Sequence, residues 1–185
     1  MKKLFLCFLI ATSFQLHSQD IIIQGKSLPL NPEYSVKFNS YELYEIDVEE
    51  VRNKIVNSPR SGIDINLVLG HNSHLLQVNK FNVIKPNCKV RIATANGIIE
   101  VDPDPTIQTY RGYNANFGGR EVAITIAKNY MSIMFGEGEE TYYLEQISHE
   151  FINSSINSFV LYDSKGYKDS HVMKNPVESV EKAKQ

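Results

Sequence analysis

The sequence has few cysteines that could form covalent cross-links. Its 185 residues include no tryptophan and two cysteines, Cys7 and Cys88. Cys7 lies in an N-terminal apolar run that we expect to be removed, so the mature chain keeps Cys88 alone. One thiol cannot form an internal disulfide, and the fold must therefore be held together by packing. Ten tyrosines and nine phenylalanines indicate that much of this packing is aromatic against β-branched side chains.

An excess of positive charge and a long apolar run are also missing. The formal net charge is −2, and no basic stripe alternates with aromatic residues, so the sequence indicates no nucleic-acid partner. The apolar run at residues 4–13 is shorter than the ~20 residues that a membrane-spanning helix needs. We therefore expect no stable membrane insertion.

Residues 1–19 have the order of a secretory signal peptide. Lys2 and Lys3 form a basic start, residues 4–13 an apolar centre and residues 16–19 a polar end. We therefore predict export, to the periplasm or to the outside of the cell. Removing the signal leaves 166 of the 185 residues, enough for one domain with a core. The formal net charge then moves from −2 to −4, because Lys2 and Lys3 are lost.

Most of the mature chain has the pattern of short strands joined by tight turns. Residues 63–69 alternate apolar and polar side chains, and residues 74–83 follow them after a turn. Asn96-Gly97 between two alternating runs is a strong hairpin signal, because both residues accept positive φ. Further predicted strands are residues 89–94, 98–101, 122–127, 132–135, 141–144 and 158–162, with turns at Asn129 and from Gly136 to Gly138.

One short helix is predicted near residues 47–57. Asp47 is a suitable N-cap, and Val48, Val51 and Ile55 share one face. The fold class is therefore mainly β, a β-rich α+β arrangement: an antiparallel β-sandwich or a partly closed barrel of hairpins and a meander. The predicted divisions are a signal peptide at 1–19, an extended arm and loop at 20–43, the β-rich module at 44–165 and a polar tail or linker at 166–185.

The second half of the chain resembles a known family. Tyr110-Arg111-Gly112-Tyr113 is followed by the polar turn of residues 118–120, the strand VAITI at 122–126 and the run TYYLEQI at 141–147. This order is similar to the pro-domain of reprolysin-type, adamalysin-like secreted zinc metalloproteases, including bacterial ones. The resemblance spans roughly residues 44–162 and is sharpest at 106–145. Ser158 stands where the family usually has His, and Gln146 where it usually has Pro.

The resemblance implies a non-catalytic module that binds a metalloprotease catalytic domain, helps it to fold and keeps it latent. The partner would follow in the same chain or be met in trans. In several metalloprotease families a pro-domain thiolate occupies the fourth zinc position, and Cys88 is the candidate for that role here. The family's switch cysteine usually follows the last strand, however, and no cysteine follows Tyr162. We therefore expect Cys88 to be buried or idle.

No catalytic or metal-binding set can be assembled from the sequence. His149-Glu150 begins like the zinc-protease motif H-E-x-x-H, but position 153 is Asn instead of the second His. His71 and His74 lack a third ligand nearby, so a solvated loop is expected. Two acidic groups lack the spacing of a calcium loop: Glu137, Glu139 and Glu140, and Asp102 and Asp104. We predict that the chain is not an enzyme and carries neither metal nor cofactor.

Four tyrosines are the candidate protein-binding residues: Tyr110, Tyr113, Tyr142 and Tyr143. Tyrosine is enriched at buried interfaces, so these rings could form a contact surface for a protease domain. The alternative is packing in the core and across strands. A second function also stays open, namely a stand-alone exported β-sandwich that binds a surface protein or a glycan.

Overall fold

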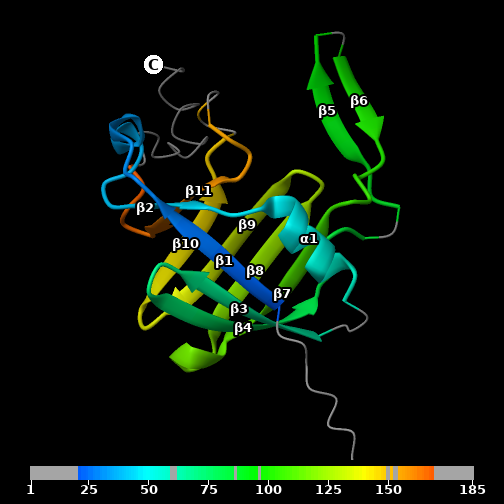
Figure 1. Cartoon of the computed structure of the whole chain (residues 1–185). Helices are drawn as coiled ribbons and strands as arrows, with labels where there is room; N and C mark the ends of the chain where they lie inside the picture. The colour runs from blue at the N-terminus through cyan, green and yellow to red at the C-terminus, as the bar shows by residue number, and fades with distance from the viewer. Residues whose placement is uncertain are drawn as a thin grey trace, which may run out of the picture.

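The computed structural model describes residues 21–58, 62–85, 87–95, 97–148, 151 and 154–168. Within these residues nine strands form one closed barrel, in the order β1-β2-β11-β10-β9-β8-β7-β4-β3, and β5 and β6 form a separate hairpin (Figure 1). The prediction of a mainly β fold is confirmed, and of the two predicted architectures it is the barrel that forms. The predicted signal peptide, His149-Glu150 with Asn153, and residues 169–185 of the predicted tail lie outside the described residues.

The elements follow the predicted order closely. The barrel strands are β1 Ile21–Leu28, β2 Glu42–Glu45, β3 Gly62–Leu69, β4 Asn72–Lys80, β7 Gln108–Asn114, β8 Arg120–Ala127, β9 Tyr130–Glu137, β10 Glu140–Gln146 and β11 Ser158–Asp163. The hairpin strands are β5 Val90–Thr94 and β6 Gly97–Val101, the helix is α1 Val48–Val56, and two 3-10 turns are η1 Pro32–Val36 and η2 Ala115–Phe117. In the described part of the chain no helix has the length and apolar character needed to cross a lipid bilayer.

For the start of residues 20–43 the sequence leaves a short strand or an extended arm open. The structure has a strand there, β1, and it corrects the placement of this segment outside the β-rich module. β1 closes the barrel, because it pairs antiparallel with β2 and parallel with β3. Ile21 and Ile23 alternate inward and are buried. A parallel pair needs a long crossover connection, which η1, β2 and α1 provide between β1 and β3. The local pattern of β1 does not reveal its parallel partner β3, because that strand lies some forty residues further along the chain.

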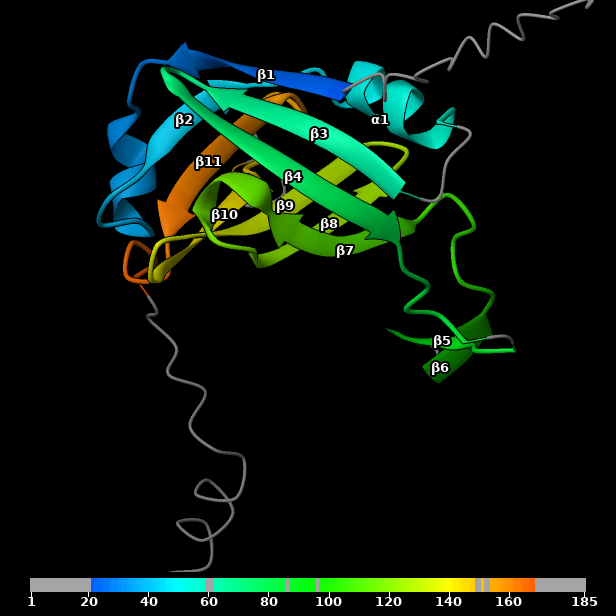
Figure 2. The same cartoon turned by 90° about the horizontal axis from the view of Figure 1, so that it is seen from below.

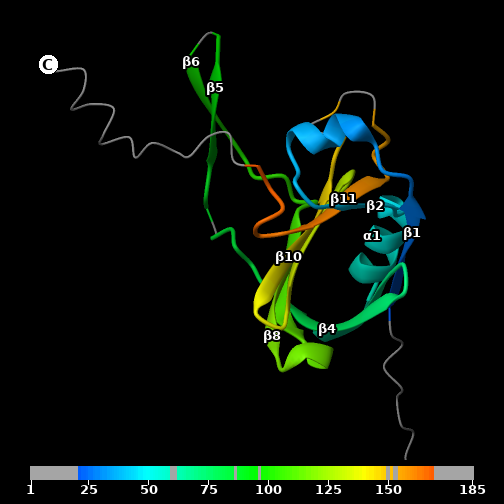
Figure 3. The same cartoon turned by 90° about the vertical axis from the view of Figure 1, so that its left-hand side faces the viewer.

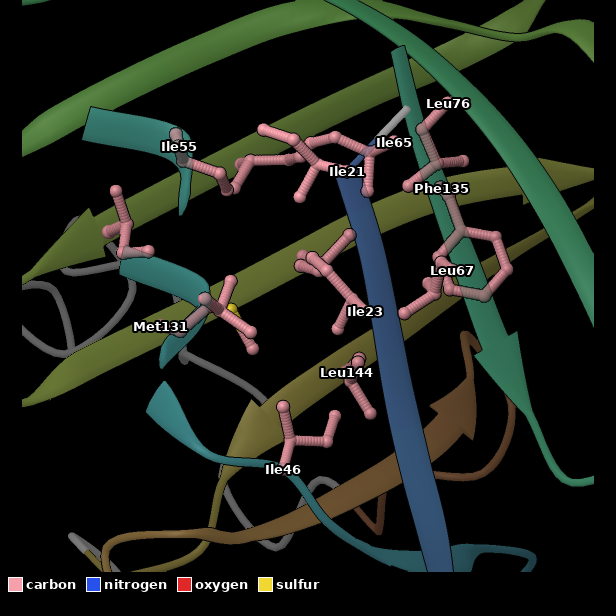
Figure 4. Packing of buried hydrophobic residues seen from close by; sticks show 14 of the residues in the cluster. Ile21, Ile23, Ile46, Ile55, Ile65, Leu67, Leu76, Met131, Phe135 and Leu144 are labelled. Carbon is pink, nitrogen blue, oxygen red and sulfur yellow. The ribbon is translucent and has the colours of Figure 1, made fainter. Parts of the chain in front are cut away.

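The barrel interior is filled with apolar side chains (Figure 4). Alternation along β3 directs Ile65 and Leu67 inward with 0% of each side chain exposed, and Phe135 on β9 is 1% exposed. The helix α1 adds Val48, Val51 and Ile55 to the same cluster and covers one end of the barrel (Figure 3). Asp47 caps this helix as predicted, because its carboxylate accepts a hydrogen bond from Glu50 N at 2.9 Å.

A second apolar cluster lies outside the barrel wall. Tyr34 and Phe38, in and just after η1, pack with Leu43 of β2 and Val160 of β11. Lys168 N donates to Lys37 O at 2.6 Å, so the chain after β11 is still attached to this cluster. The predicted tail therefore does not begin at residue 166.

Positive φ values occur at several of the predicted turn glycines but not at the predicted turn asparagine, Asn129. Gly118, Gly119 and Gly138 have φ of 65°, 79° and 59°, as tight turns require. Asn129 turns the chain between β8 and β9 without a positive φ, which among the described non-glycine residues only Asn87 adopts. Gly136 lies within β9 instead of in a turn, and a Cβ there would lie 2.5 Å from Arg120 Cβ.

Candidate protein-binding surface

The hairpin β5–β6 stands away from the barrel on two linking segments (Figures 1 and 2). In the described residues its strands pair only with each other. Every residue of β5 is exposed, and in β6 Val101 alone is half-buried. A two-stranded hairpin without further support is marginally stable in water. We call residues 81–107, which comprise the hairpin and both linking segments, the arm.

The hairpin has one aliphatic face and one mixed face, and the mixed face carries Ala93 and Ile98 beside its charged pair. Val90 lies opposite Val101, and Ile92 lies opposite Ile99. Directly opposed residues share a face of the sheet, so these four aliphatic side chains lie together. Arg91 lies opposite Glu100 on the other face and donates to its carboxylate at 2.8 Å. The apolar face is open to solvent, since Ile92 is 43% and Ile99 48% exposed.

Exposed apolar side chains continue onto the root of the arm. A groove of about 300 Å³ lies there, lined by Asn82, Val83, Ile84, Ile107, Thr109 and Thr125. Phe81 N donates to Thr109 O at 2.8 Å, which attaches the root of the arm to β7. The Arg111 guanidinium lies 4.5 Å from the centre of the Phe81 ring, a favourable cation–π contact.

The arm concentrates the exposed apolar surface of the molecule. Of the fourteen large hydrophobic side chains that are exposed in the described residues, eight lie between residues 81 and 107. They are Phe81, Val83, Ile84, Val90, Ile92, Ile98, Ile99 and Ile107. Single exposed apolar residues are ordinary on a protein surface, whereas a contiguous group is typical of an interaction site. The sequence contained the signal, in the alternation of residues 90–94 and 98–101, but the residues that cover a strand cannot be read from its own pattern.

Cys88 lies in the arm, two residues before β5, and is exposed. The expectation of a buried thiol is therefore wrong, while an idle thiol stays a prediction. Its Sγ donates weakly to the neighbouring Lys89 O at 3.9 Å. Among the residues that the structure describes, no three His, Cys, Asp or Glu side chains are placed to hold a metal ion.

The four predicted tyrosines do not form one surface. Tyr110 is 3% exposed in the core cluster, its hydroxyl donates to Gln108 Oε1 at 2.7 Å, and burial raises the pKa of its hydroxyl. It therefore offers no surface to a partner, and the packing alternative holds for this ring. Tyr113, on the same strand β7, is 47% exposed.

The other two tyrosines, Tyr142 and Tyr143, are half-buried neighbours on β10. Tyr142 stacks on Phe135 with ring centres 5.7 Å apart, and Tyr143 stacks on Tyr162 at 5.4 Å. Burial, followed by the charges of Glu137 and Glu140, raises the pKa of the Tyr142 hydroxyl. Since β8 and β9 lie between β7 and β10, neither ring lies beside Tyr113.

The two histidines of the predicted turn are separated by the fold. His71 lies exposed in the turn between β3 and β4, whereas His74 faces the barrel interior and is 3% exposed. A solvated loop is thus the correct description for His71 and wrong for His74. The signal that could have found His74 is the alternation of β4, since His74 shares its buried face with Leu76 and Val78.

Three of the five residues in the predicted acidic groups, Glu140, Asp102 and Asp104, have partners in the structure. Glu140 accepts from Lys165 Nζ at 2.9 Å, and Asp102 pairs with Lys89. The backbone N–H of Thr106 donates to Asp104 at 2.8 Å and lowers the pKa of that carboxyl.

A scan against protein-family models finds no family that matches this chain, and a search of curated proteins finds no match either.

Proposed function

We propose that this chain is a non-catalytic exported module that binds a partner protein through the arm. The partner we propose is the catalytic domain of a reprolysin-type zinc metalloprotease, which the module helps to fold and keeps latent. The observation that carries the proposal is the open apolar face of Val90, Ile92, Ile99 and Val101 on a hairpin that the barrel does not support. The resemblance of residues 106–145 to reprolysin-type pro-domains supplies the class of partner.

Burial of the arm would stabilise a complex substantially. Complete burial of one Val or Ile side chain contributes about 1.5 to 3 kcal/mol. The hairpin also offers free strand edges, whereas every strand of the closed barrel already pairs on both sides. An extended segment of a partner can add to such an edge and bury the apolar face at the same time.

The chemistry of the hairpin favours a protein over a glycan. A ligand rich in hydroxyl groups needs polar side chains that are free to orient it. The polar groups of the hairpin pair with each other instead, Arg91 with Glu100 and Lys89 with Asp102. The aliphatic side chains that remain are those that pack well against another protein.

A binding assay with surface variants tests the proposal. Residues 20–185 would be mixed with a reprolysin-type catalytic domain from the same source, and binding and peptide hydrolysis would be measured together. We expect tight binding with loss of hydrolysis, and Ile92→Asp or Ile99→Asp should weaken both at least about tenfold, because a buried unpaired charge is costly. Leu30→Asp is the matched control: Leu30 is 64% exposed outside the arm, and its replacement should change neither measurement.

The outcomes separate the parts of the proposal. Absence of both binding and inhibition by the folded domain would end the assignment of a metalloprotease partner. If binding is unchanged in both Ile92→Asp and Ile99→Asp, the metalloprotease stays the proposed partner, but the arm is excluded as the binding surface. Cys88→Ser then distinguishes two modes of latency: a thiolate that reaches the zinc predicts a loss of inhibition larger than the loss of binding, whereas contact alone predicts no change.

A further inference from the structure

We propose that His74 makes the barrel acid-sensitive, because protonation of its buried imidazole loosens the end of the barrel that η2 covers. This device is independent of the arm and of its partner. Figure 1 places the arm and η2 at opposite ends of β7. His74 lies on the inward face of β4, directly opposite Leu67 of β3.

The surroundings of His74 are those of an aromatic core residue. Its ring centre lies 4.6 Å from that of Phe135 on β9 and 5.8 Å from that of Phe117 in η2. Nδ1 is buried and has no hydrogen-bond partner among the described residues. The neutral imidazole therefore packs as a ring, while an imidazolium would need water or an acceptor at Nδ1, where the described residues offer none.

Few charges act on the ring from the elements around it. Glu137 at the end of β9 favours the protonated form, while Glu140 on β10 already pairs with Lys165. On β8, Arg120 packs its aliphatic stem beside Gly136. Other titratable groups near this end include two exposed ones, His71 in the β3–β4 turn and Glu139 in the β9–β10 turn. Glu121 lies on β8, Asp163 acts on Tyr142, and the raised pKa values of Tyr142 and Tyr44 keep both phenols neutral. Desolvation outweighs Glu137 and lowers the pKa of His74 below 6.5.

The sign of the pH effect follows from this shift. Above pH 6.5 the imidazole is neutral in both the folded and the unfolded chain, and folding carries no penalty. As the pH falls below that value, the unfolded chain binds a proton that the folded chain does not bind. Stability contributed by the neutral ring is therefore lost progressively until the lowered pKa of the folded state is passed.

The segment that we expect protonation of His74 to destabilise most is η2. Leu75 N donates to Asn116 Oδ1 at 2.8 Å, and Asn114 Nδ2 donates to Gly136 O at 3.0 Å. These two bonds attach η2 and the end of β7 to β4 and β9. Water reaches a protonated His74 most directly by displacing Phe117, which is half-buried and lies on this short turn. We therefore expect opening to begin at residues 115–119.

Two histidines three positions apart give a matched test. Urea unfolding would be measured from pH 7.5 to pH 5.0 for the natural chain, for His74→Phe and for His71→Phe. Because the unfolded chain binds a proton that the folded chain does not bind, the unfolding constant of the natural chain should rise more over this range than that of His74→Phe. His71→Phe should keep the natural pH dependence. Equal pH dependence in all three proteins would overturn the proposal.

Three further measurements keep the proposal testable if Phe is not tolerated. His74→Gln stays neutral at every pH and should remove the same part of the pH dependence. An NMR titration of the imidazole Cε1–H protons in the natural chain should give His74 a midpoint below 6.5, and a midpoint at or above 6.5 would contradict the burial argument. Amide exchange at residues 115–119, corrected for the intrinsic rate, should be faster at pH 5.0 than at pH 7.5, and unchanged protection there would exclude local opening.

Discussion

The barrel strand β3 and the hairpin β5–β6 have similar alternating sequences but differ in how far their apolar side chains are buried. Both place Ile, Leu or Val at alternate positions, yet Leu67 is 0% exposed whereas Ile92 is 43% exposed. β3 is paired on both sides in a sheet that closes on itself, so its inward face meets the inward faces of the other strands. Within the part of the chain that the structure describes, the hairpin strands pair only with each other. Alternation therefore predicts a strand with an apolar face, but it does not predict what covers that face.

The largest expected effect lies in the barrel core. Phe135→Ala removes a ring that is 1% exposed and contacts both His74 and Tyr142. We expect a loss of about 3 to 5 kcal/mol in the free energy of unfolding, because a cavity replaces the ring. Ile99→Ala in the hairpin should cost less than about 0.5 kcal/mol. Urea denaturation of both variants measures the contrast, and comparable losses would show that the hairpin face is already covered in solution.

The next effect concerns the close approach of two barrel strands. A Cβ on Gly112 of β7 would lie 1.8 Å from Gln77 O and 2.7 Å from Val78 Cα on β4, and these backbone atoms cannot rotate away. Gly112→Ala should therefore cost on the order of 3 kcal/mol. Gly118→Ala is the comparison outside the strands, where space is open but φ is 65°; it should cost about 1 to 2 kcal/mol. Thermal unfolding that ranks Gly118→Ala as the more damaging change would contradict this description of the β4–β7 contact.

A smaller effect is expected at the helix that covers one end of the barrel. Asp47→Ala removes the acceptor for Glu50 N and should lower the free energy of unfolding by about 1 kcal/mol. Asp47→Ser retains a capping oxygen and should restore most of the loss. If Ala and Ser behave alike in chemical denaturation, the stability of α1 comes from Val48, Val51 and Ile55 alone.

The smallest effect is expected in the hairpin's ion pair. The Arg91 and Glu100 side chains are 74% and 51% exposed, and water and salt screen such pairs. Glu100→Gln should change the stability of the whole domain by less than about 0.5 kcal/mol. Urea denaturation at low and at high salt measures this, and a loss above 1 kcal/mol would mean that the hairpin supports the barrel.

Local chemistry accounts for the elements that the sequence predicts well. Asp47, as an N-cap residue, predicts the start of α1, and glycines accept the positive φ of several turns. The hairpin strands β5 and β6 and the last strand from Ser158 also lie where the pattern predicts them. Each of these signals depends on residues within a few positions of one another, which a sequence displays directly.

The candidate site was less accessible to sequence reasoning. Tyrosine is common at protein interfaces, which favours it as a candidate binding residue, yet Tyr110 lies in the core. The aliphatic residues of the arm resemble any half-buried strand, and only the absence of a covering layer distinguishes them. His74 stands at the first position of the strand predicted at residues 74–83, and its burial depends on Phe117 and Phe135, which lie far along the chain.

By itself, the sequence determined most of the strand and turn pattern and the capped helix. Tertiary structure alone decided that β1 closes the barrel, that His74 is enclosed by aromatic rings and that the hairpin is left outside. The physical reason is range. Backbone propensity and side-chain alternation act between neighbours in the chain, whereas burial depends on which distant strands come to lie opposite one another.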